Sequence, residues 1–243
     1  MKINTVNIIP VEIKKALLYN NRINIKKDRT MKLRDSEIYR YAGFKGNTPD
    51  RETVAKTEEL KKEATSAVTP LFISREADFV CPDGNTVVID GVKFRSQKLS
   101  KLLSRADKVL LFAATLGVES DRILRKYSVS DSSKYVLAQA VLTEMIENCC
   151  DSVLGELLKK YQKSGYSFLP RYSPGYGDLP LEYQREFFSL MDITKRIGVT
   201  LNGDCLMTPS KSVTAFIGIT REALDCPVPC ELCDKTDCQF RRN

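Results

Sequence analysis

One short segment of the chain combines residue types that suit a small charged ligand. Residues 171–180 have the sequence RYSPGYGDLP. The guanidinium of Arg171 suits a carboxylate, Gly175 lets a ligand approach the backbone closely, and Tyr176 adds a flat ring and a hydroxyl. A zwitterionic ligand with an aromatic base would fit such a turn. Because proline, glycine and tyrosine are also common in loops, composition alone favours a purely structural turn.

A second group of reactive side chains lies near the end of the sequence. Four of the eight cysteines have the spacing C-x3-C-x2-C-x4-C, namely Cys226, Cys230, Cys233 and Cys238. Neither a signal peptide nor a long apolar stretch is evident, so we expect a cytoplasmic protein without membrane contact, in which such a cluster favours a metal site over disulfides. Four thiolates suit zinc or an iron–sulfur cluster, and the spacing does not separate the two. A free or redox-active set of thiols is the alternative.

Two residue types are missing from the 243 residues: histidine and tryptophan. Without histidine, a Ser-His-Asp or Cys-His catalytic centre is excluded, as is any metal site that needs imidazole. Without tryptophan, no indole ring is available to stack on a base or a sugar.

The net charge of +7 arises in the first quarter of the chain. Residues 1–62 carry 15 Lys and Arg against 8 Asp and Glu, whereas residues 63–243 carry 23 of each kind. This basic segment is either a solvated face or a docking surface for an acidic partner or nucleic acid. No aromatic-rich basic strand or recognition motif accompanies the charge, which argues against nucleic acid.

The helices and strands that must position these residues are interspersed along the chain. Strands are expected at 71–73, 108–115 and 212–219, and at 86–89 and 92–94 around the two-residue turn Asp90-Gly91. Helices are expected at 48–66 with Thr48 as the N-cap, and at 96–103, 119–127, 132–162 and 181–197. The order has no regular alternation of strand and helix, which favours an α+β fold.

Motifs spread over about residues 105–220 resemble the activation domain of cobalamin-dependent methionine synthase. The turn at 171–176 matches the family's Arg-x-x-x-Gly-Tyr motif. The segments GVTL at 198–201 and LMTPSKSV at 206–213 are similar to its Gly-Met-Lys-Leu and Met-x-Pro-x-x-Ser-Val segments. The segment FAATLGVESD at 112–121 resembles the strand and helix start that precede the family's long helix. The resemblance implies a mixed or antiparallel twisted sheet flanked by helices.

The resemblance also implies which residues bind S-adenosylmethionine. Arg171 matches the family arginine that holds the carboxylate of this ligand. Ser173, Gly175 and Tyr176 match the backbone-contact and tyrosine positions of the same motif. On the long helix, Glu147 falls near a family glutamate that faces the ligand.

Parts of the family's binding site have no counterpart in this sequence. Glu144 is a second candidate for the helix glutamate, and a solvated helix face is the alternative for Glu147. Gly165 stands where the family has an acidic residue. The family's tyrosine pair after the Ser-Val strand is missing, and its N-terminal acid cannot be placed in residues 1–100. The pocket is therefore expected to be incomplete, weaker or completed by a partner.

The activity implied by the resemblance is the reductive reactivation of cob(II)alamin. One electron from a flavodoxin- or ferredoxin-like donor and the methyl group of S-adenosylmethionine give methylcobalamin and S-adenosylhomocysteine, without a protein nucleophile. We expect a stand-alone protein that acts on cobalamin carried by a separate methionine synthase or related corrinoid methyltransferase. Whether the chain is itself an enzyme, a methyltransferase, stays open because the reactive cofactor lies on the other protein.

Three segments follow from these assignments. Residues 1–104 are expected to form a basic N-terminal part that packs on the main domain, residues 105–222 the S-adenosylmethionine-binding core, and residues 223–243 a Cys-rich metal-binding tail. Two alternative functions stay open. One is an iron–sulfur reductive activator of a corrinoid protein, in which the tail performs the chemistry. The other is a non-enzymatic binding module that is stapled by a metal and docks through its basic segment.

Overall fold

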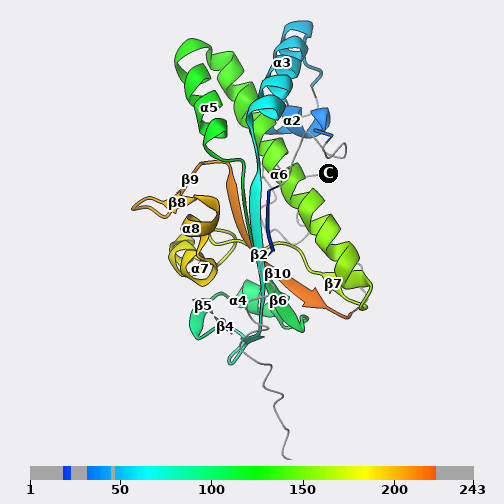
Figure 1. Cartoon of the computed structure of the whole chain (residues 1–243), viewed down its shortest axis with the longest axis vertical. Helices are drawn as coiled ribbons and strands as arrows, with labels where there is room; N and C mark the ends of the chain where they lie inside the picture. Colours follow the sequence, from blue (N-terminus) through cyan, green and yellow to red (C-terminus); the bar gives the residue numbers. More distant parts are fainter. Residues whose placement is uncertain (1–18, 23–31, 45–46, 223–243) are drawn as a thin grey trace, which may run out of the picture.

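The computed structural model describes residues 19–22, 32–44 and 47–222. At the centre of this part lies a five-stranded sheet (Figure 1). Its strand order is β1 (Tyr19–Arg22), β2 (Leu71–Ala77), β6 (Lys108–Thr115), β10 (Ser212–Thr220) and β7 (Ser167–Phe168). All neighbouring pairs are antiparallel, and β6 pairs with β10 from Thr115–Ser212 to Lys108–Ile219. An antiparallel sheet flanked by helices confirms the α+β prediction.

One face of the sheet is covered by a layer of helices (Figure 1). The long helix α6 (Ser132–Gln162) is contacted by α2 (Asp35–Tyr41), α3 (Arg51–Ala67) and α5 (Val118–Ser130). Alternate strand residues face this layer: Phe72 of β2 and Phe112 of β6 are buried in one cluster with Val141 and Met145 of α6. The apolar stripe of α6 is therefore the core of this layer.

The other face of the sheet packs on shorter elements. They are a small sheet of β3 (Phe79–Val80), β4 (Thr86–Ile89) and β5 (Val92–Arg95), with α4 (Gln97–Leu103), α7 (Gln184–Met191) and α8 (Ile193–Ile197). Phe216 of β10 is fully buried here, with its ring centroid 5.0 Å from that of Phe94 and 4.8 Å from that of Phe187. Because both faces are covered, β6 has an uninterrupted apolar sequence.

Several elements have the bounds that the sequence predicts. β6 covers 108–115 and α6 covers 132–162. The turn between β4 and β5 is a two-residue hairpin turn, in which Asp90 and Gly91 have φ of 49° and 83°. Both residues adopt the left-handed conformation that this type of turn requires. These segments were predictable because each has a strong local signal.

Two predictions about helices are wrong. The helix expected at 48–66 begins at Arg51, and its N-cap is Asp50, whose side chain accepts a hydrogen bond from Thr53 N at 2.7 Å. Thr48 lies before the helix. The helix expected at 181–197 is divided into a 3-10 turn η1 (Leu181–Tyr183), α7 and α8, because Asp192 adopts a left-handed conformation with φ of 57°.

The proposed N-terminal segment and the proposed core contribute to one sheet. β2, before residue 104, pairs with β6, after it, and the three-part division of the chain stays a prediction.

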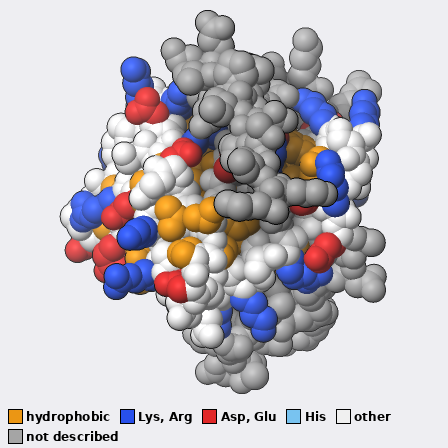
Figure 2. All heavy atoms as spheres, turned by 90° about the horizontal axis from the view of Figure 1, so that it is seen from below, with side chains coloured by type: hydrophobic (Ala, Val, Ile, Leu, Met, Phe, Trp, Pro, Cys, Tyr) orange, Lys and Arg blue, Asp and Glu red, His pale blue; other side chains and the backbone are white. Residues whose placement is uncertain are grey.

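On the face seen in Figure 2, charged side chains of both signs are interspersed around a group of apolar side chains. Residues 1–18 and 23–31, which carry much of the basic segment, lie outside the described part. None of the described helices combines the length and hydropathy that a membrane span requires.

Candidate functional site

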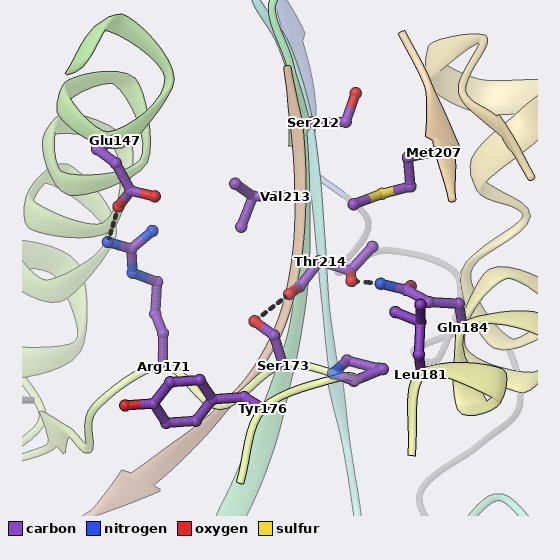
Figure 3. Close-up of a pocket in the computed structure, with 11 residues that line it drawn as sticks. Glu147, Arg171, Ser173, Tyr176, Leu181, Gln184, Met207, Ser212, Val213 and Thr214 are labelled. Carbon is purple, nitrogen blue, oxygen red and sulfur yellow. Dashed lines mark hydrogen bonds and ion pairs between the residues drawn. The ribbon is translucent and has the colours of Figure 1, made fainter. Parts of the chain in front are cut away.

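A pocket of about 430 Å³ opens at the edge of β10, which is within the size range of small-molecule sites. It lies between α6, the segment 171–176, and the start of α7 (Figure 3). The short hairpin of β8 (Thr200–Leu201) and β9 (Met207–Thr208) adds to one wall. The lining residues are Glu147, Arg171, Ser173, Pro174, Tyr176, Leu181, Gln184, Met207, Ser212, Val213 and Thr214.

The segment 169–173 is held against β10 like an irregular edge strand. Leu169 N donates to Gly218 O at 2.8 Å, and Tyr172 exchanges two backbone hydrogen bonds with Phe216, at 2.9 and 2.7 Å. One step further along, Ser173 Oγ donates to the carbonyl oxygen of Thr214 at 2.6 Å. These bonds fix the backbone on both sides of Arg171 relative to the sheet.

A tight turn follows at Gly175. Its φ of 86° lies in the left-handed region, and its N–H donates to Leu179 O at 2.8 Å. A Cβ at this position would lie 3.0 Å from Cδ1 of Leu181. Glycine is therefore required by the backbone of the turn. The next residue, Tyr176, is 44% exposed at the pocket mouth, and its ring stands edge-on to that of Tyr172. Gly175 shapes the turn, whereas Tyr176 lines the pocket.

Asp178 anchors the far end of this turn to α4. Its carboxylate accepts hydrogen bonds from Ser96 Oγ at 2.5 Å, Lys98 N at 3.1 Å and Tyr172 OH at 3.0 Å. Partial burial opposes ionisation, but the hydrogen bonds from Ser96 and Lys98 outweigh it and lower the pKa of Asp178. Asp178 was not predicted as an anchor, because Ser96 and Lys98 lie about 80 positions away in the sequence.

Charged side chains form one wall of the pocket. Arg171 Nη2 donates to Glu147 Oε2 at 2.7 Å and to Asp151 Oδ1 at 3.1 Å. Burial alone would lower the pKa of Arg171, but the two carboxylates outweigh it and raise that pKa. The guanidinium is therefore charged at all ordinary pH values. Asp151 was not predicted from the sequence, although its position one helical turn after Glu147 places both acids on one face of α6.

The two glutamates considered on α6 have different partners. Glu147 lines the pocket, with its side chain 27% exposed. Glu144 is completely buried and accepts three hydrogen bonds from Arg34: from N at 3.2 Å, from Nε at 2.8 Å and from Nη2 at 3.2 Å. Glu144 thus ties the segment before α2 to α6. Of the two, the structure places Glu147 beside Arg171.

The opposite wall of the pocket is apolar apart from one amide. Leu181 and Met207 line it together with Gln184 (Figure 3). Gln184 is only 3% exposed, and its side-chain Oε1 accepts a hydrogen bond from Thr214 Oγ1 at 2.9 Å. Nothing in the local sequence marked Gln184, because its environment is created by β10 and the hairpin of β8 and β9.

A lysine lies beside the pocket without lining it. Lys211 Nζ donates to Thr143 Oγ1 at 2.9 Å, and Thr143 precedes Glu147 by one turn of α6. Burial lowers the pKa of Lys211 to about 8. The face of α6 that carries Thr143 and Glu147 therefore has a row of polar contacts that ends at the charged wall.

The predicted metal ligands Cys226, Cys230, Cys233 and Cys238 lie outside the described residues. Within the described part, no group of three or more cysteine or acidic side chains is arranged to hold a metal ion. Burial raises the pKa of Cys149 to about 12, and the neighbouring Cys150 is also fully buried with a raised pKa. These two thiols belong to the core.

Comparison with known proteins assigns the chain to a family. The family model of the vitamin B12 dependent methionine synthase activation domain matches residues 48–225. A solved structure described as the MetH reactivation domain bound to AdoHcy aligns with a TM-score of 0.56 and 14% identity, over 85% of this chain and 79% of that one. No curated protein matches the sequence. The structural likeness shows a shared fold, and the family match covers well over half of the chain. The protein therefore belongs to the vitamin B12 dependent methionine synthase activation domain family.

Proposed function

We propose that the pocket beside Arg171 binds S-adenosylmethionine and presents its methyl group to cobalamin carried by another protein. The family match and the fold shared with an AdoHcy-bound domain support this proposal. In the proposed reaction, one electron from a flavodoxin- or ferredoxin-like donor and the methyl group convert cob(II)alamin into methylcobalamin and leave S-adenosylhomocysteine. The chain has no histidine, hence no Asp-x-His-x-x-Gly loop for cobalt. In this proposal, a separate methionine synthase or related corrinoid methyltransferase carries the cobalamin.

The observation that carries the proposal is the state of the Arg171 guanidinium. Both of its side-chain hydrogen bonds use Nη2, which is held by Glu147 and Asp151. Within the described part of the chain, Nη1 and Nε have no hydrogen-bond partner, and the side chain lines the pocket. A fixed, charged fork with free donors is suited to a ligand carboxylate.

The remaining charges and surfaces match the rest of the ligand. Glu147, Asp151 and Arg171 together carry one net negative charge, which favours the sulfonium and ammonium groups of S-adenosylmethionine. The apolar wall at Leu181 and Met207 suits a flat base. Because the nucleophile belongs to the other protein, the task of these residues is to bind, orient and shield the methyl donor.

Calorimetric titration with S-adenosylmethionine tests the proposal. We expect saturable binding to the wild type, weakened by about 1.5–3 kcal/mol in Arg171→Ala, because a charge-assisted hydrogen bond is lost. Arg105→Ala is the matched control, since Arg105 pairs with Glu222 at the surface and does not line the pocket. Equal binding by the wild type and Arg171→Ala would refute the site. No binding by the wild type would refute the proposed function of this chain.

A further inference from the structure

The pocket has two chemically different walls that face each other. Arg171 and Glu147 lie on one side, and Gln184, Leu181 and Met207 lie on the other, with Val213 and Thr214 of β10 between them (Figure 3). If the charged wall holds the amino-acid end of the ligand, the base lies against the opposite wall. This orientation of the ligand rests on the proposed function.

Gln184 is held in a fixed orientation on that wall. It is the first residue of α7, and its amide oxygen Oε1 accepts a hydrogen bond from Thr214 Oγ1 at 2.9 Å. Thr214 is itself 1% exposed, and its carbonyl oxygen accepts from Ser173 Oγ. A side chain whose rotamer is fixed by a buried partner binds a ligand with little loss of entropy.

The other end of the amide is available to a ligand. Among the described residues, Nε2 of Gln184 has no hydrogen-bond partner. The residue lines the pocket and is only 3% exposed. Because the residue lines the pocket, the N–H donors of this amide can be offered to a bound ligand. Oε1 also retains a second lone pair beside the one that accepts from Thr214. Gln184 therefore offers one donor direction and one acceptor direction on an otherwise apolar wall.

We propose that Gln184 selects the base of the nucleoside ligand and favours adenine. Adenine has an amino donor next to a ring-nitrogen acceptor, which is the complement of a glutamine amide. In hypoxanthine a carbonyl oxygen replaces the amino group, so two oxygens would face each other across the contact. Leu181 and Met207 supply the apolar contact with the ring but distinguish the two bases poorly, because both are flat and of similar size.

The test compares S-adenosylhomocysteine with S-inosylhomocysteine by calorimetric titration. The wild type is expected to bind the adenosyl compound about 10- to 100-fold more tightly, as for a good bidentate amide contact. In Gln184→Leu, the preference should fall to near unity, mainly through weaker binding of the adenosyl compound. Gln162→Leu, at the exposed end of α6, is the matched control and should keep the full preference.

A second variant keeps the inference testable if Gln184→Leu fails to fold. Gln184→Glu retains an acceptor for Thr214 but has no Nε2 donor, and it should also lose the preference. A variant that binds both compounds more weakly by the same factor would overturn the inference, because Gln184 would then only support the fold. If the wild type binds both compounds equally well, only the inference about Gln184 is overturned. If the wild type does not bind the adenosyl compound, the proposed function is overturned as well.

Discussion

At the scale of single residues, the two glutamates of α6 show what sequence patterns can and cannot decide. The helix and the presence of acids on it were predictable from the spacing of its residues. Which arginine pairs with which glutamate was not predictable, because Arg34 is 110 positions from Glu144 and Arg171 is 24 positions from Glu147. Arg171, Ser173 and Tyr176 were predicted from one local motif and do line one pocket with Glu147. Asp178 and Gln184 were missed, since their environments depend on distant segments. Asp151 was missed although its spacing from Glu147 on α6 is a local signal.

The different surroundings of Glu147 and Glu144 predict opposite phenotypes for two similar substitutions. In Glu147→Gln, binding of S-adenosylmethionine should weaken roughly tenfold, because a charge beside the ligand and a firm partner of Arg171 are lost. The free energy of unfolding should change little, since this ion pair is partly exposed. In Glu144→Gln, the free energy of unfolding should fall by about 1–3 kcal/mol, because a fully buried carboxylate that accepts hydrogen bonds from Arg34 is removed.

Urea denaturation and calorimetric titration of both proteins check this prediction. The two variants control for each other, since each removes one negative charge from the same helix. Ligand affinity should stay at the wild-type value in Glu144→Gln. If Glu144→Gln lost affinity while Glu147→Gln kept it, the ligand would contact the other side of α6, and the assignment of Glu147 would be wrong.

At the scale of elements, local signals fixed the strands and helices but not how they are joined. β6 and α6 were predictable because their apolar patterns are strong. β2 extends beyond the expected 71–73 to Ala77 and includes Ser74, Arg75 and Glu76, which are placed there by pairing with β6. The way the segment 169–173 follows the edge of β10 was also beyond prediction. A polar sequence can continue a sheet when its backbone groups find partners on a neighbouring strand.

The contact between the 171–180 segment and α4 should depend on pH through Asp178. Because the pKa of Asp178 is lowered in the folded protein, its carboxylate stabilises the fold above the ordinary aspartate pKa. That stabilisation is lost as the pH falls through the lowered pKa. Asp178→Asn should therefore be less stable than the wild type at pH 7, by less than about 1 kcal/mol given the exposure of this residue. The difference should shrink towards pH 3.

Thermal unfolding of the wild type and Asp178→Asn between pH 3 and 7 measures this difference. Asp204→Asn, an exposed aspartate between β8 and β9, serves as the control for loss of one carboxylate. We also expect Asp178→Asn to bind S-adenosylmethionine more weakly, because asparagine has one acceptor oxygen where the carboxylate uses two, so the turn that carries Tyr176 loses part of its link to Ser96 and Lys98. A stability difference that is constant over this pH range would show that Asp178 does not anchor the turn as an anion.

At the scale of the whole molecule, the sheet separates two layers, each with its own apolar cluster (Figure 1). The pocket lies at the edge of the sheet, and both α6 of one layer and α7 of the other contribute lining residues to it. The α+β class was predictable from the order of elements. The family match begins at residue 48, and this extent was not predictable, because the recognisable motifs begin only near residue 105. At 14% identity, the likeness to the MetH domain is one of fold.

The remaining question at this scale is whether the cysteine tail holds a metal. The described part of the chain offers no competing site for a metal ion. Its thiols at Cys149 and Cys150 are buried and protonated. Elemental analysis after anaerobic, iron-replete preparation should therefore find a metal that is lost in Cys230→Ser and in Cys233→Ser but retained in Cys81→Ser, the half-buried control. Iron with acid-labile sulfide and a reducible visible absorbance would support a short electron path to cobalamin. Zinc alone would limit the tail to a structural role, and absence of any metal would refute the proposed site.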